Sequence, residues 1–63
     1  LTTRELEVLQ LLEDGSTYTE IGSALYVSNR TIEHHVSSIL RKLGARSRRD
    51  AVHLAIERGI ISG

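Results

Sequence analysis

The sequence contains no cysteine, proline, methionine, tryptophan or phenylalanine, and its only aromatic residues are two tyrosines. Without cysteine there is no disulfide framework and no thiolate site for a metal. No apolar run approaches the ~18 residues that a membrane-spanning helix needs, and no basic segment leads into an apolar run as in a signal peptide. The core must therefore consist of Leu, Ile, Val and Ala side chains, which suits a small helical bundle.

A chain of 63 residues buries only about 60% of its unfolded surface, so it has little room for an enclosed pocket. We therefore expect one domain over residues 1–63, with no cofactor, no catalytic site, no small-molecule ligand and no membrane contact. A binding module is the default function. The chain begins with Leu1 rather than Met, which indicates a piece of a longer protein.

The formal net charge is zero, but the charges are segregated along the chain. Residues 1–27 carry one base against five acids, whereas residues 28–50 carry six bases against two acids. The basic segment indicates a polyanionic partner on one face, although ordinary solvated helix surfaces explain the charge pattern equally well.

The first half of the chain carries start and stop signals for two helices. Thr2 and Thr17 are each followed three residues later by Glu, the spacing of a capping box. Leucines at helical spacing follow Thr2, and Gly15 follows them as a stop, so we expect a helix over about residues 3–14. The second capping box opens a short helix through Leu25.

The second half contains signals for two further helices. Ser28 is an N-cap candidate, and a helix of ~15 residues closed by Gly44 is expected after it. Ser47, with Asp50 three residues later, starts a fourth helix that ends before Gly59. We therefore expect an all-α fold, a compact four-helix bundle. The apolar stripe of the third helix is formed by Ile32, Val36, Ile39, Leu40 and Leu43.

A three-residue turn joins the second and third expected helices, so they must cross at a steep angle, as in a helix-turn-helix. Gly22 lies in the middle of the second helix, where it costs about 1 kcal/mol of helix propensity relative to Ala. A small residue is useful there if the third helix approaches that backbone closely. The alternative is a Gly without a packing role.

Three strings, taken together, resemble one family: LTTRELEVLQLL, TEIGSALYVSNRTIEHHVSSILRKL and ARSRRDAV. They are similar to the LuxR-type (GerE-type) helix-turn-helix domain that ends many bacterial response regulators and quorum-sensing regulators. Two positions depart from the family's pattern: Gly22 replaces the more usual Ala, and Glu33 stands where many members carry Lys. The resemblance implies sequence-specific binding to double-stranded DNA in transcription regulation, in a bacterial, cytoplasmic protein that is not an enzyme.

The third helix, about Asn29–Leu43, is then the recognition helix, whose N-terminal part enters the major groove. By the family's pattern the base-reading positions are Glu33, His34 and Ser37, with Arg30 close to them. Glu33 can accept from the cytosine N4 amine and Ser37 can bond to any base, whereas neutral His34 offers one donor or one acceptor. Alternatively, Glu33 pairs with Arg30 or Ser37 on the helix surface.

Other residues are expected to contact phosphate. The free amides and the dipole at the start of a helix suit an anion, and Lys or Arg beside phosphate adds affinity through counterion release. For the basic cluster at residues 46–49, solvated surface charge is an equally good interpretation. The predicted phosphate-contacting residues are Thr17, Tyr18, Ser28, Asn29, Thr31, His35, Arg41, Lys42, Arg46, Ser47 and Arg48.

The histidines do not indicate a metal site. His34 and His35 are adjacent and therefore point about 100° apart on a helix, and no Cys or clustered carboxylate completes a ligand set. We interpret His35 as a packing residue that also donates to phosphate, and His53 as a surface or interface residue.

The fourth helix has more apolar surface than one buried face requires. Val52 and Ile56 lie four residues apart, and Ala51, Leu54 and Ala55 occupy a neighbouring arc. We expect one arc to close the core and the other, Val52 and Ile56 with Arg49, to pair with a second copy. The alternative is one broad core-facing stripe. In the resembled family this helix commonly dimerises, which implies pseudo-palindromic half-sites.

Two other functions fit some of the same residues. One is a helical protein-interaction module that has lost DNA binding, which Glu33 and the zero net charge favour and the basic cluster disfavours. The other is a sigma-factor-like promoter-reading domain, which would also bind the polymerase core. For the regulator itself, RNA polymerase is a further candidate partner.

Overall fold

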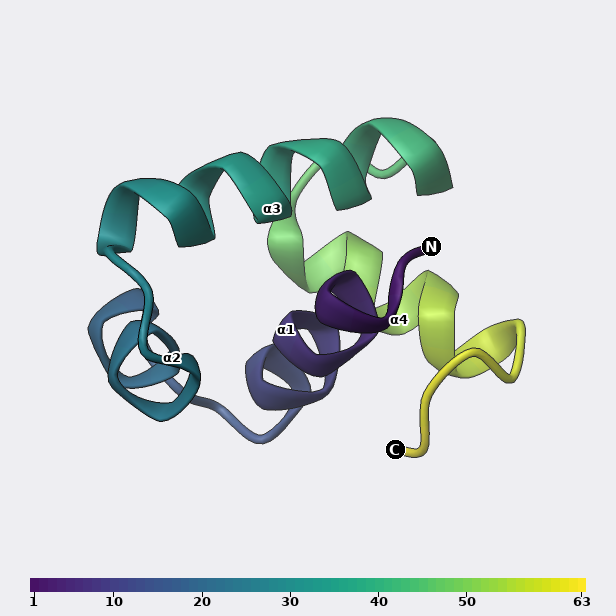
Figure 1. Ribbon diagram of the computed structural model, residues 1–63. Coiled ribbons are helices and arrows are strands. Elements are labelled where there is room, and N and C mark those ends of the chain that lie inside the picture. The colour runs from purple at the N-terminus through teal and green to yellow at the C-terminus, as the bar shows by residue number, and fades with distance from the viewer.

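The computed structural model describes all residues 1–63 and consists of four helices joined by short connections (Figure 1). As the sequence predicts, there are no strands. Each helix begins and ends within one or two residues of its expected position. In chain order the helices are α1 (Thr3–Glu13), α2 (Tyr18–Leu25), α3 (Asn29–Leu43) and α4 (Arg48–Glu57).

The predicted helix-start signals are all used. Thr2 and Thr17 each form a complete capping box with the Glu three residues later. The Ser28 hydroxyl accepts from the Thr31 amide at 3.1 Å, and Ser47 caps α4 in the same way. These side chains satisfy amides that have no partner within the helix, which fixes where each helix begins.

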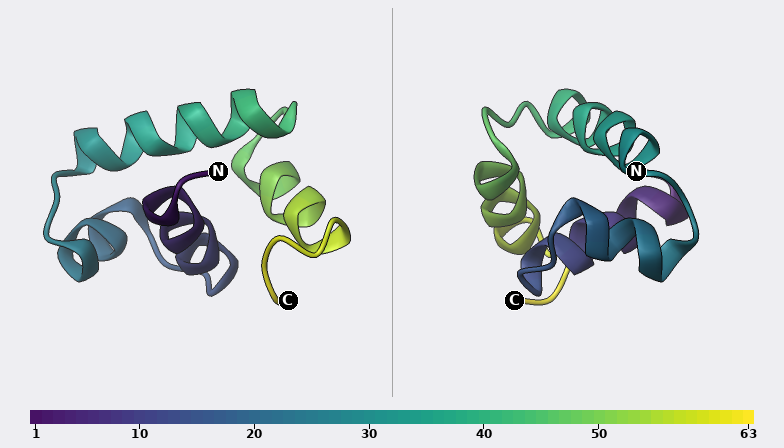
Figure 2. Two further views of the ribbon diagram at one scale, coloured as in Figure 1. Left: turned by 45° about the vertical axis from the view of Figure 1, so that its right-hand side comes forward. Right: turned by 90° about the vertical axis from the view of Figure 1, so that its left-hand side faces the viewer.

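The core lies between α3 and the other three helices. α1 and α3 each pack against all the others, and in Figures 1 and 2 the side of α3 that faces away from α1 and α2 is not covered by any other part of the chain. The predicted stripe of α3 is buried except for Leu40, which is half-buried. The buried apolar residues are Val8, Leu9, Ile21, Ile32, Val36, Ile39, Leu43, Ala51 and Ala55.

The turn between α2 and α3 explains the glycine in the middle of α2. A β-carbon on Gly22 would lie 2.6 Å from the carbonyl oxygen of Val27 and 3.4 Å from Oδ1 of Asn29. The turn backbone, together with the first residue of α3, therefore closes onto α2 at this point, as the small residue suggested. The Val27 amide also donates to the Gly22 carbonyl at 2.9 Å, which ends α2.

Tyr26 ends α2 in a way that sequence reasoning did not predict. Its backbone is left-handed, with φ 60° and ψ 42°, and its side chain is 94% exposed. Left-handed backbone is uncommon for a residue with a β-carbon. The helix-ending turn requires this conformation here, as it does at Gly44 after α3, where φ is 68°.

None of the four helices has the length and apolar character of a membrane span.

Candidate nucleic-acid interface

The four predicted base-reading residues lie together on the uncovered side of α3. Arg30, Glu33, His34 and Ser37 are all exposed and line one open hollow that contains no apolar side chain. Their spacing of three and four residues places them on the same helix face. This surface, called the reading face below, is opposite the buried stripe that packs against α1 and α2.

Glu33 makes no ion pair on the reading face. Arg30 is one turn away, yet the structure has no hydrogen bond or salt bridge between the two side chains or between Glu33 and Ser37. The surface pairing that the sequence left open is therefore absent. Both charged groups remain available to a ligand.

The N-terminal ends of α2 and α3 each leave free amides. In α2 the Thr17 amide donates to Oε1 of Glu20 at 2.7 Å, and the Glu20 amide donates back to the Thr17 hydroxyl at 3.1 Å. The cap thus uses the Thr17 amide, while the amides of Tyr18 and Thr19 have no partner. Such unpaired amides at a helix N-terminus attract anions.

Asn29 links the two helices in the free domain. Its Nδ2 donates to the Thr19 hydroxyl at 2.9 Å, which ties the first residue of α3 to the first turn of α2. Sequence reasoning placed Asn29 only in the phosphate-contacting set and missed this link. An Asn directly after an N-cap Ser was the available signal, since its amide reaches across the tight turn.

The basic cluster at the start of α4 is exposed. The Arg46 amide donates to Oδ2 of Asp50 at 2.9 Å, which holds the connection after α3 in place. The Arg48 guanidinium lies 5.1 Å from the centre of the Tyr18 ring, a cation–π contact that joins α4 to α2. Beside it, a cavity of about 500 Å³ lies between the α1–α2 connection and α4, with Arg48 and Arg49 in its lining.

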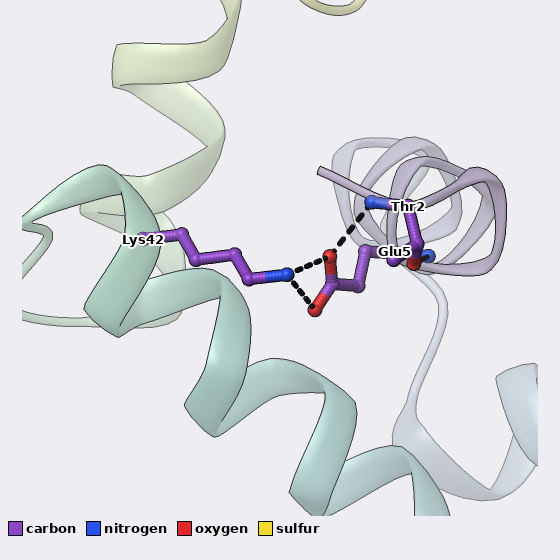
Figure 3. Close-up of polar contacts among 3 residues, drawn as sticks. All are labelled: Thr2, Glu5 and Lys42. Carbon is purple, nitrogen blue, oxygen red and sulfur yellow. Dashed lines mark hydrogen bonds and ion pairs between the residues drawn. The ribbon is translucent and has the colours of Figure 1, made fainter.

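Lys42 has a partner that sequence reasoning did not find. Its Nζ donates to both carboxylate oxygens of Glu5, at 2.9 and 3.2 Å, and the Thr2 amide donates to Oε1 at 2.8 Å (Figure 3). Glu5 is only 4% exposed. The Thr2 amide, followed by the Lys42 ammonium and the Ser38 hydroxyl, holds the pKa of Glu5 at about 2 instead of 4.5, against burial, which raises it.

The remaining predicted phosphate contacts differ in exposure. Arg41 is exposed on the last turns of α3, whereas Thr31 and His35 are half-buried. The position of His35 agrees with its interpretation as a packing residue. His53 is exposed on α4, with its Nε2 2.9 Å from Oε2 of Glu57.

Of the predicted dimer residues of α4, Val52 packs partly against the core, whereas Arg49 and Ile56 are exposed. Ala51 and Ala55 close the core, while Val52 is half-buried and Ile56 is 38% exposed. Arg49 is exposed one turn before Val52. On the surface of α4, the core therefore leaves Ile56 exposed and Val52 only partly accessible.

Comparisons with known proteins identify the family and the fold. Residues 1–55 match the family described as "Bacterial regulatory proteins, luxR family". The chain is 49% identical to the transcriptional regulatory protein DegU of Brevibacillus brevis over 59 residues, which is 94% of this chain and 25% of DegU. It is 44% identical to the spore germination protein GerE of Bacillus subtilis over 52 residues, 82% of this chain and 70% of GerE.

A solved structure has the same fold. The crystal structure of the response regulator ChrA, from a heme-sensing two-component system, superposes with a TM-score of 0.93 at 34% sequence identity. The superposition covers 97% of this chain and 30% of ChrA. The chain thus spans about a quarter of DegU and of the transcriptional activator BjaR1 of Bradyrhizobium diazoefficiens, and a larger share of GerE.

Proposed function

The chain belongs to the luxR family of bacterial regulatory proteins, and from this premise we propose how its structure binds DNA. A chain of this family is a DNA-binding transcription regulator and not an enzyme. Its α2 and α3 form the helix-turn-helix, α3 enters the major groove with its N-terminal half, and α2 crosses the sugar-phosphate backbone.

One observation carries this proposal: the reading face is polar, exposed and uncovered, and its four side chains line a single hollow. α3 is also held rigidly behind that face. Asn29 ties its first residue to α2, and Lys42 ties its last turn to Glu5 on α1. A helix fixed at both ends presents its outer side chains without a further ordering cost, which favours selective binding.

On the reading face, we assign base contacts to Glu33, His34 and Ser37, with Arg30 next to them. Arg30 suits either a guanine edge or a neighbouring phosphate, because its guanidinium pairs well with both. The hydroxyl of Ser37 and the neutral ring of His34 have both donor and acceptor options, so they tolerate several bases.

Phosphate contacts surround the reading face in this proposal. The free amides of Tyr18 and Thr19 lie at the start of α2, and the exposed guanidinium groups of Arg46 and Arg48 lie at the start of α4. The proposed set of phosphate contacts also contains the remaining predicted residues, which are Thr17, Ser28, Asn29, Thr31, His35, Arg41 and Ser47. Lys42 also stays in it, although its ammonium is already bonded to Glu5.

We further propose that two copies bind together through α4. The strip that would form the contact consists of the exposed Ile56 and Arg49 and the half-buried Val52. A two-fold axis through this strip would pair the same residues of both copies. The operator bound by such a dimer would then consist of two pseudo-palindromic half-sites. RNA polymerase is a further proposed partner for which no particular surface is assigned.

The relation of these residues to a longer regulator is also a proposal. Because the chain spans about a quarter of DegU and BjaR1, we place it as the DNA-binding effector part of a larger cytoplasmic protein.

The test is fluorescence anisotropy of a labelled random duplex titrated with the domain at salt concentrations from about 20 to 200 mM. Binding through several phosphates predicts that log K falls linearly with log[salt], with about 0.9 added to the slope for each phosphate neutralised. Absence of binding at the lowest salt, for the domain and for a covalently tethered dimer, would instead favour a protein-interaction module.

A further inference from the structure

Glu33 has no structural task in the free domain. It is the only acidic residue of α3. The helix dipole favours a carboxylate in the first turn of a helix, and Glu33 lies beyond that turn. The N-cap of α3 is Ser28, so Glu33 does not cap the helix either. With no ion pair to Arg30, the carboxylate contributes nothing visible to folding.

A carboxylate that enters the major groove is repelled by phosphate and by most base edges. Guanine presents two acceptors there, O6 and N7, and thymine presents the acceptor O4. Adenine presents the N6 amine, but the acceptor N7 lies beside it and opposes a second carboxylate oxygen. Cytosine presents the N4 amine with no acceptor on its own major-groove edge, so that only the O6 of the paired guanine lies beside it. A carboxylate therefore binds cytosine and discriminates against the other three bases.

We propose that Glu33 makes the operator half-site require a cytosine at the position that faces it. This inference rests on the proposed function, since it applies only if the reading face enters the major groove. Among the four residues of the hollow, Glu33 is the only one that can only accept a hydrogen bond. It therefore selects for a base that donates, and it lowers the affinity for DNA that lacks the cytosine.

The test compares the wild-type domain with Glu33→Gln and with a matched control, Glu7→Gln. Each substitution keeps the side-chain shape and removes one negative charge, but Glu7 lies on α1, where it pairs with Arg4 at 3.8 Å. A randomised-duplex selection is run with each protein, followed by anisotropy on the selected site.

The wild type and Glu7→Gln are expected to select cytosine at one position of each half-site, and replacing that C·G pair by T·A should weaken binding by about tenfold or more. Glu33→Gln should select adenine there, because Gln bonds to adenine N6 and N7 together. N4-methylcytosine at this position should weaken DNA binding by the wild type but not by Glu33→Ala. The methyl group replaces the amine hydrogen that points into the major groove and donates to Glu33.

If the wild type and Glu33→Gln select the same base at every position, the inference is wrong while the proposed function stands. If neither protein binds any duplex at low salt, although circular dichroism shows both folded, the proposed function and the inference fail together.

Discussion

Replacing Glu5 by Gln tests the buried ion pair that holds α1 against α3. The carboxylate is 4% exposed and accepts from the Thr2 amide and, through both oxygens, from Lys42. Gln keeps the shape and one acceptor for the Thr2 amide, so the capping box survives in weakened form. The charge that pairs with Lys42 is lost. We therefore expect a destabilised but folded domain.

The magnitude follows from the lowered pKa of Glu5. A fall from 4.5 to about 2 corresponds to about 3 kcal/mol of preferential stabilisation of the ionised form. Because Gln retains a neutral hydrogen bond to Thr2, and the Lys42 side chain is 42% exposed to screening solvent, we expect a loss of about 2 kcal/mol at pH 7. A domain of this size has a total stability of roughly 3–9 kcal/mol, so the loss is large.

The same pKa fixes the pH dependence. The folded pKa lies below the unfolded one, so the contribution of Glu5 is complete above about pH 4.5 and is lost as the pH falls towards 2. Urea unfolding followed by circular dichroism at pH 7, 4 and 2.5 should show the difference between wild type and Glu5→Gln shrinking with acid. Glu7→Gln, at a half-exposed pair, should change stability by less than about 0.5 kcal/mol. An equal loss for Glu5→Gln at pH 7 and pH 2.5 would refute the electrostatic explanation.

Three further predictions follow from other contacts. Gly22→Ala gains about 1 kcal/mol in helix propensity but forces a β-carbon to within 2.6 Å of the Val27 carbonyl; we expect a net destabilisation of about 1 kcal/mol by thermal unfolding, and a higher Tm would contradict the close approach. If Arg30 contacts phosphate, Arg30→Ala should weaken binding to every duplex and lower the salt slope by about 0.9; an unchanged slope would leave Arg30 with a guanine edge as its only proposed contact. Ile56→Glu should reduce dimerisation in sedimentation experiments while helicity is kept, and unfolding instead would assign Ile56 to the core.

Local signals in the sequence predicted the fold well because the helix boundaries are determined locally. The hydroxyl of Thr17 caps an amide three residues away, and Gly44 supplies a positive φ directly after α3. The apolar stripe of α3 then orients that helix, and the reading face follows as its opposite side. The stripe alone leaves Asn29 and Arg41 on the outer side as well, and the resemblance to the family selected the base-reading positions. The structure places the four selected side chains around one hollow.

The features that the sequence did not reveal depend on contacts across the chain. Glu5 and Lys42 are 37 residues apart, and each has an ordinary local interpretation, as a capping carboxylate and as a basic residue of α3. Only the packing of α1 against α3 brings them together. Tyr26 was missed for a different reason: its left-handed backbone is dictated by the tight turn, while a tyrosine carries no local preference for it.

The fold separates the groups that hold α3 from the groups that we propose to read DNA. Asn29 and the Gly22 contact fix the first turn of α3, and the Lys42–Glu5 pair fixes its last turn. Glu33, on the outer face between them, bonds to none of these groups. Substitutions at the two kinds of position should therefore be additive: in the double variant Glu5→Gln/Glu33→Gln, the stability loss should equal that of Glu5→Gln and the base preference that of Glu33→Gln. A coupling above about 0.5 kcal/mol, in the free energy of unfolding or in the binding preference between bases, would show that the anchoring of α3 affects the reading face.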